Sequence, residues 1–271
     1  MSVKLPKVPV FPTLVTLASA VCGFTAILYS CTGQLEHASI AAWLILAAIV
    51  LDGVDGRLAR ATGRASDFGI ELDSLCDLVS FGVAPAVLAL SVMVGPELLL
   101  GASAAAGVRL LKRFYWLIGS AYVACAAIRL ARFNVVTSLE TEAHRHFIGL
   151  PSPAAAGLVA AMVIAHAGLA SPQTPHQGLL AQFILPAAIV LVSVLMISRV
   201  RYGHLLYELS KGGRSLALVV QLFFAGAIIA LLQEFALAVL FVAYVLSGLV
   251  GVALNRVLER MESAEEGQPQ P

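Results

Sequence analysis

Residues 38–56 read ASIAAWLILAAIVLDGVDG, an apolar run that ends in the two acids Asp52 and Asp55. A transmembrane helix needs about 20 consecutive apolar residues, so this stretch is long enough to cross a bilayer. Runs of similar character occur along most of the chain. We therefore predict an all-α fold, a polytopic membrane bundle of about eight transmembrane helices, at residues 13–32, 38–56, 68–95, 114–133, 152–170, 179–198, 215–232 and 235–254.

The composition excludes several classes of protein. Hydrophobic residues make up 59% of the 271 residues, charged residues make up 12%, and the mean hydropathy is +0.91. A soluble domain carries about 25% charged residues, so this chain cannot cover its apolar content with a water-facing surface. The net charge of +1 offers no basic excess for neutralising nucleic-acid phosphates. An ordinary soluble enzyme, a disordered protein and a nucleic-acid binder are therefore excluded.

Lysine and arginine are distributed unevenly between the two sides that eight helices would define. With the N-terminus inside, 14 of the 17 basic residues fall in inner segments, and the outer segments hold Arg109, Lys112 and Arg113. The positive-inside rule then places both termini and the ends of the helices that carry the acids in the cytoplasm. We expect residues 1–258 to form a single membrane domain and residues 259–271 to form a disordered polar tail.

Four acids lie in two pairs on the second and third predicted helices. Asp52 and Asp55 are three residues apart, and Asp73 and Asp77 are four apart, so each pair shares one helix face. Carboxylates at membrane depth are costly unless another group neutralises them. Small residues beside the acids would leave room for a bulky anionic group: Gly56, Ala59 and Gly69.

Oxygen-only ligands suit Mg²⁺, Mn²⁺ or Ca²⁺ better than zinc. Four carboxylates can hold two such ions about 4 Å apart, an arrangement that stabilises the attacking and leaving oxygens of a phosphoryl transfer. Two other interpretations remain open on spacing alone. The acids could serve buried helix–helix contacts, or they could carry a cation through a membrane carrier.

The pattern D-x2-D-G-x2-A-R-x8-G-x3-D-x3-D, which spans residues 52–77, resembles the signature of the CDP-alcohol phosphatidyltransferase family at every position. The resemblance implies a membrane enzyme that moves a phosphatidyl group from a CDP-linked lipid to an alcohol and releases CMP. It also implies two Mg²⁺ or Mn²⁺ ions held by four ligands, Asp52, Asp55, Asp73 and Asp77, the last of which is also the catalytic general base. The residues implied to bind the CDP-lipid are Thr16, Gly56, Ala59, Arg60, Ser66 and Gly69.

Three stretches outside or beyond that signature are similar to the bacterial integral-membrane phosphatidylserine synthases of the family: DSLCDLVSFGVAPA (73–86), RLARFNV (129–135) and FIGLPSPAAAG (147–157). A fainter match is LMISRVRY (195–202). This resemblance implies CDP-diacylglycerol and L-serine as substrates, and a bacterial-type inner membrane as the location. We expect membrane lipid as a partner, no nucleic acid, and a possible homodimer.

Free serine is a zwitterion, and its carboxylate suits the paired N–H donors of an arginine. The candidate serine-binding residues are Arg129, Arg132, Asn134 and Ser152. Their alternative roles are ordinary ones, because the arginines could be membrane anchors and Ser152 could cap a helix. A sibling transferase that uses glycerol 3-phosphate or an inositol phosphate is the nearest rival. His144, His146 and the stretch KGGR (211–214) could bind a metal or a phosphate, but solvated loops commonly hold such residues.

Overall fold

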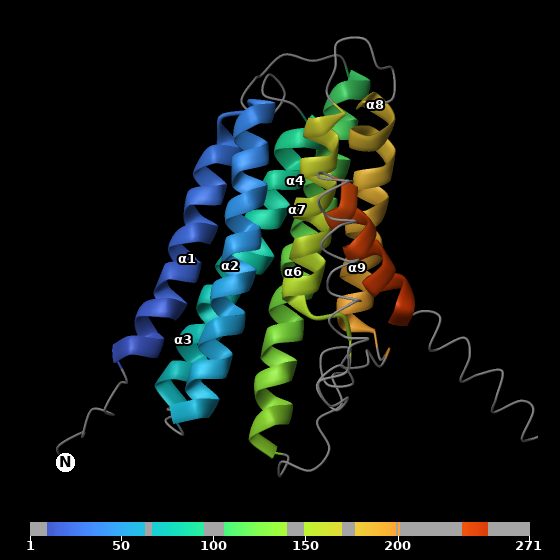
Figure 1. The fold of residues 1–271 in the computed structure, drawn as a ribbon. Helices are drawn as coiled ribbons and strands as arrows, with labels where there is room; N and C mark the ends of the chain where they lie inside the picture. Colours follow the sequence, from blue (N-terminus) through green and yellow to red (C-terminus); the bar gives the residue numbers. More distant parts are fainter. Residues whose placement is uncertain are drawn as a thin grey trace, which may run out of the picture.

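The computed structural model describes residues 10–62, 67–94, 106–139, 149–169, 177–198, 200 and 235–248. Nearly all of these residues are helical, and none of them lies in a strand. Five helical stretches are long and apolar enough to cross a membrane, and they stand side by side as a bundle (Figure 1). The prediction of an all-α polytopic membrane bundle is therefore confirmed.

The five spans come from nine elements, some of which are continuous with one another. They are α1 (Val10–Cys31), α2 (Leu35–Thr62), the continuous run α3 (Asp67–Asp77), η1 (Leu78–Val83) and α4 (Ala84–Val94), then α6 (Ala106–Leu139), and the run α8 (Gln177–Leu179), η3 (Leu180–Ile184) and α9 (Leu185–Ile197). Two shorter apolar helices are α7 (Ser152–Gly168) and the helix Phe235–Gly248. The predicted run at 215–232 and the predicted tail at 259–271 lie outside the described residues, so the number eight stays a prediction.

Helix α6 is much longer than its predicted span of residues 114–133. Its 34 residues extend about 50 Å at a rise of about 1.5 Å per residue, which exceeds the hydrocarbon thickness of a bilayer. The three basic residues that the sequence places on the outer side therefore lie in its first turns. The Lys112 ammonium sits 4.9 Å from the centre of the Trp116 ring. Tryptophan and lysine are both favoured at the membrane–water interface, so this trio is compatible with the predicted topology.

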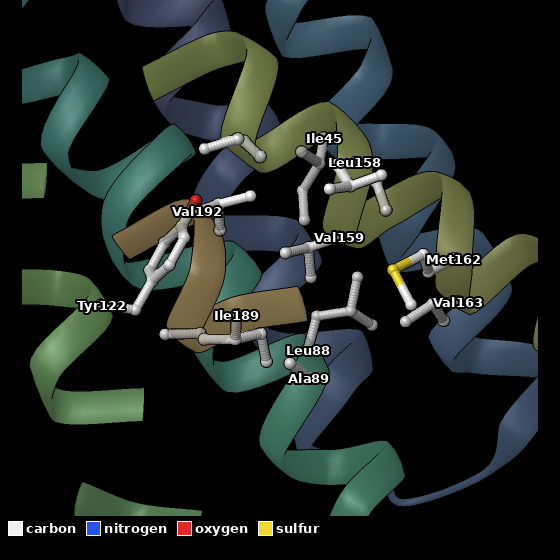
Figure 2. Close-up of a cluster of buried hydrophobic side chains, with 14 of the residues drawn as sticks. Ile45, Leu88, Ala89, Tyr122, Leu158, Val159, Met162, Val163, Ile189 and Val192 are labelled. Carbon is white, nitrogen blue, oxygen red and sulfur yellow. The ribbon is translucent and has the colours of Figure 1, made fainter. Parts of the chain in front are cut away.

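Helix α7 forms the centre of the bundle. From Ala155 to His166 its side chains are buried on every side, as expected of a helix enclosed by other helices. Figure 2 shows Leu158, Val159, Met162 and Val163 of α7 among side chains of the neighbouring helices, with Ile45 of α2 close by. Alanines dominate the other α7 positions, and small residues let helix backbones approach closely in a membrane.

The third span contains a π-helical segment, η1, directly after Asp77. The Ala84 N–H donates a hydrogen bond to the Val79 carbonyl, five residues earlier, which is the spacing of a π-helical turn. Neighbouring helices hold this segment in place: the Tyr122 hydroxyl donates to the Phe81 carbonyl at 3.0 Å, and the Ser80 hydroxyl donates to the Ser19 carbonyl at 3.0 Å. These contacts fix the end of α3 against α1 and α6.

Gly23 is required where α1 crosses η1. A Cβ atom at this position would lie 2.7 Å from the Ser80 Cα and 2.6 Å from its hydroxyl oxygen. We predict that Gly23→Ala lowers the free energy of unfolding by about 1–3 kcal/mol, the usual cost of overpacking. Thermal unfolding of the purified protein in detergent measures the effect. Gly107→Ala is the matched control, because a Cβ there meets nothing within 4 Å; equal melting temperatures for the two variants would contradict the close contact.

The orientation of the bundle can be tested with a native cysteine. Cys31 is exposed at the end of α1, whereas Cys22 and Cys125 are half-buried and Cys76 is buried. Asp52 lies 17 residues into α2 from its first residue Leu35, about 25 Å from the Cys31 end of the bundle. We predict that a membrane-impermeant maleimide labels Cys31 in intact cells and that Cys31→Ser removes the label. Labelling only after permeabilisation would place the acids on the outer face.

Candidate active site

Three of the four predicted acids converge at one end of the bundle. Asp52 of α2 and Asp73 and Asp77 of α3 each offer a carboxylate oxygen, and these oxygens all lie within 4.8 Å of one another. All three side chains are half-buried between helices that are otherwise apolar. Like charges so close together repel, and bound cations relieve that repulsion. The donor set consists of hard anionic oxygens, and it fits Mg²⁺ or Mn²⁺.

Asp55 lies beside this cluster, one turn after Asp52 on α2. Its side chain is 7% exposed and accepts a hydrogen bond from the Thr16 hydroxyl of α1 through Oδ2. Its other oxygen, Oδ1, is buried without a hydrogen-bond partner among the described residues. An unpartnered buried carboxylate oxygen is costly, and a metal ion would satisfy it. Asp55 also lies near enough to Asp73 for the two charges to interact, and its role as a fourth ligand stays a prediction.

The residues predicted to bind the CDP-lipid occupy the same end of the bundle. Gly56, Ala59 and Arg60 follow Asp55 along the last two turns of α2. Gly69 lies on α3 one turn before Asp73 and is half-buried. Ser66 lies outside the described residues, as do His144, His146 and residues 211–214. Thr16 is bound to Asp55, a contact that the sequence did not predict; its contact with the CDP-lipid stays a prediction.

Arg129 of α6 and Ser152 of α7 are brought together beside the acids. The Arg129 guanidinium donates to the Ser152 hydroxyl, and it interacts electrostatically with Asp77 and Asp52. It also lies 6.0 Å from the centre of the Phe133 ring. Ser152 is fully buried in the first turn of α7, directly after Pro151 at the N-cap position. Its hydroxyl accepts from Arg129, and its contact with the substrate stays a prediction.

The other two serine-binding candidates point elsewhere. The Arg132 guanidinium donates to the Ile197 carbonyl at 3.2 Å and so satisfies a carbonyl at the end of α9. The Asn134 amide donates to the Ser74 hydroxyl at 2.9 Å, next to Asp73. These bonds tie α6 to α9 and to α3. Arg129 is thus the candidate whose charge acts on Asp52 and Asp77, Ser152 bonds to it, and Asn134 bonds to the residue after Asp73.

A short extended segment sets the position of Ser152. Gly149 has a φ of 92°, a conformation that favours glycine, and its N–H donates to the Val200 carbonyl at 2.8 Å. The Leu150 N–H donates to the Leu195 carbonyl at 3.0 Å. This pairing with the end of α9 fixes the first turn of α7, where Pro151 precedes the helix and Pro153 lies within its first turn. The described part of the predicted stretch, GLPSP (149–153), therefore has a structural role around Ser152.

Comparison with known proteins agrees with this geometry. Residues 9–196 match the family model of the CDP-alcohol phosphatidyltransferases, and the chain belongs to that family. It is 35% identical to CDP-diacylglycerol–serine O-phosphatidyltransferase of Helicobacter pylori over 240 residues, which cover 89% of this chain and 90% of that protein. It is also 35% identical to archaetidylserine synthase of Methanothermobacter thermautotrophicus over 201 residues, 73% and 72% of the two chains. A Saccharomyces cerevisiae CDP-diacylglycerol–serine O-phosphatidyltransferase is 36% identical over 55% of this chain.

The acid cluster can be tested by removing one charge at a time. We predict that Asp52→Asn and Asp73→Asn each abolish CMP release, because each change removes an anionic ligand from the convergent set. Glu71→Gln is the matched control, since it removes one charge from an exposed position two residues before Asp73. Glu71→Gln should retain turnover. Normal turnover by either aspartate variant at ordinary Mn²⁺ would exclude that residue from the metal site.

Proposed function

We propose that this protein transfers the phosphatidyl group of CDP-diacylglycerol to the hydroxyl of L-serine, giving phosphatidylserine and CMP. The observation that carries the proposal is the convergence of Asp52, Asp73 and Asp77, with Arg129 close enough for its charge to act on Asp52 and Asp77, in a chain that belongs to the CDP-alcohol phosphatidyltransferase family. Two relatives that align over most of the chain are a serine phosphatidyltransferase and an archaetidylserine synthase, and both support serine as the acceptor.

The four acids would have two roles, metal binding and proton transfer. Asp52, Asp55 and Asp73 would act as ligands for two divalent ions, which when bound neutralise the diphosphate and stabilise CMP as a leaving group. Asp77 contributes an oxygen to the same cluster, and it would also accept the proton from the serine hydroxyl. The serine oxygen forms a bond to the phosphatidyl phosphorus, and the phosphoanhydride bond to CMP breaks. The proton stays on Asp77 until it is released to solvent.

Arg129 would bind the serine carboxylate. Its guanidinium is held by the buried Ser152 hydroxyl and faces Asp77 and Asp52, so a serine bound to it would place its hydroxyl near the base. The serine ammonium would find carboxylate oxygens on the opposite side. Glycerol 3-phosphate and inositol phosphate carry a phosphate dianion, which favours several cations. Arg129 acts on Asp52 and Asp77 through its charge, and its guanidinium fork matches an acceptor that carries a carboxylate.

We propose that the site opens to the cytoplasm of a bacterial-type inner membrane, with both termini on that side. The inner excess of lysine and arginine supports this orientation. Serine would then arrive from the cytosol, and the lipid donor would enter from the inner leaflet. The homodimer stays a prediction.

A single assay tests the acceptor. Purified protein is incubated with labelled CDP-diacylglycerol and Mn²⁺, and with serine, glycerol 3-phosphate or inositol phosphate in separate reactions. We expect CMP and a lipid product with serine, and little product with either phosphate. Product formation with glycerol 3-phosphate alone would overturn the choice of serine. The absence of CMP with every alcohol would favour a cation carrier instead.

Base and acceptor binding can be separated by substitution. Arg129→Lys keeps the charge but loses the fork of N–H donors. The loss of one hydrogen bond to a charged group costs about 1.5–3 kcal/mol, so we predict a roughly tenfold to hundredfold rise in the serine KM. Arg132→Lys should change the serine KM by less, because Arg132 contacts the Ile197 carbonyl. Asp77→Asn should remove the chemical step while CDP-diacylglycerol still binds.

The results that would contradict the arginine assignment differ from those that would contradict Asp77 as the base. If Arg132→Lys raises the serine KM and Arg129→Lys does not, Arg132 binds the acceptor and Arg129 supports the helix packing. If Asp77→Asn retains rapid turnover, another group is the base. Steady-state kinetics with each substrate varied separately, together with equilibrium binding of CDP-diacylglycerol, distinguish these cases.

A further inference from the structure

The helix Phe235–Gly248 lies beyond the residues that match the family model, which end at 196. It nevertheless belongs to the core of the described structure. Ala236 and Val245 are buried, and Phe241 and Tyr244 pack against the central cluster of apolar side chains. Figure 1 shows this helix in red beside the bundle, close to α9. A segment outside the shared family region therefore contacts the part of the molecule that holds the site.

A glycine on α7 sets where this helix sits. A Cβ atom on Gly157 would overlap the Phe241 ring, so the ring occupies the space that the missing side chain leaves. Gly157 is itself fully enclosed in the middle of α7. The contact between the Phe241 ring and Gly157 therefore fixes the position of the helix Phe235–Gly248 along the axis of α7.

At that position Tyr244 lies close enough to Arg129 for the charge of the guanidinium to act on it. Tyr244 is half-buried, and it interacts electrostatically with the Arg129 guanidinium. Tyr244 follows Phe241 by three residues, so the two side chains lie on the same face of their helix, the face that Phe241 turns toward α7. Ser152, which bonds to Arg129, precedes Gly157 by five residues on α7. Arg129 is therefore bordered by Ser152 of α7, Tyr244 of the C-terminal helix and the acids.

We propose that Tyr244 is a positioning residue for acceptor specificity: together with Ser152 it holds the Arg129 guanidinium in the orientation that receives the acceptor carboxylate. This inference rests on the proposed function and extends it to a helix outside the family-matched residues. A guanidinium has five N–H donors, and Ser152 engages one NH1 group. A phenolic oxygen on a second side limits rotation of the guanidinium plane, and the donors that face Asp52 and Asp77 stay available to a ligand. The acids would hold the CDP-lipid donor on their own side of Arg129, so we expect its binding not to depend on Tyr244.

The test is a kinetic comparison of Tyr244→Phe and Tyr244→Leu with the wild-type enzyme. Tyr244→Phe removes only the hydroxyl, and we expect the serine KM to rise about three- to tenfold, the effect of one net hydrogen bond, with the CDP-diacylglycerol KM unchanged. Tyr244→Leu should have at least as large an effect. Tyr115→Phe is the matched control. Tyr115 lies on α6, the helix that carries Arg129, but 14 residues before it, and its hydroxyl donates to the Gln182 carbonyl of η3 at 3.0 Å. It should leave both KM values unchanged.

Gly157→Ala provides an independent variant, because the added methyl group displaces the Phe241 ring and with it Tyr244. It should also raise the serine KM more than the CDP-diacylglycerol KM. An unchanged serine KM in Tyr244→Phe, or an equal rise in both KM values, would overturn the inference. If Tyr244→Leu does not purify in folded form, Tyr244→Phe still decides the matter. Wild-type protein that shows no activity with serine would instead overturn the proposed function, so the two failures are distinguishable.

Discussion

The mutual repulsion of carboxylates inside an apolar bundle is the constraint on which the rest of this structure depends. Asp52, Asp73 and Asp77 bring their oxygens within 4.8 Å of one another, and Asp55 is buried beside them. Such a group is tolerated at membrane depth only where counter-charges are held nearby. The surrounding helices supply part of this compensation through Arg129 and the Thr16 hydroxyl. Divalent metal ions would compensate the rest of the negative charge. The carboxylate cluster that the fold builds is therefore the group that the chemistry of the family requires.

Much of the fold could be predicted from hydropathy, because the bilayer sets the length of an apolar run. The predicted runs at 13–32, 38–56, 68–95 and 179–198 coincide with spans of the structure. The ends of α6 could not be predicted in the same way, since its first turns carry charged residues and its last turn carries the polar residues Thr137 and Ser138, none of which belongs to an apolar run. The π-helical segment after Asp77 was also unpredictable, because it depends on Tyr122 and Ser80 bonds to distant parts of the chain.

The acids of the site could be predicted from spacing, since residues three and four apart share a helix face whatever the tertiary structure. The structure brings three of them into one cluster, with Asp55 beside it. The contacts around them join residues far apart in the sequence. Thr16 and Asp55 are separated by 39 positions, and Arg129 and Ser152 by 23, so no local pattern indicated either bond. Arg132 and Asn134 show the converse: their residue types suggested ligand binding, and the structure engages them with Ile197 and Ser74.

Binding of divalent cations by the clustered carboxylates can be measured directly. Mn²⁺ is titrated into the purified protein, and electron paramagnetic resonance monitors the free ion. The account predicts saturable binding of two ions per chain, competition by Mg²⁺, and loss of the binding when Asp52 and Asp73 are both replaced by asparagine. Phosphatidyl transfer that continues in excess chelator, or Mn²⁺ binding that survives the double replacement, would contradict it.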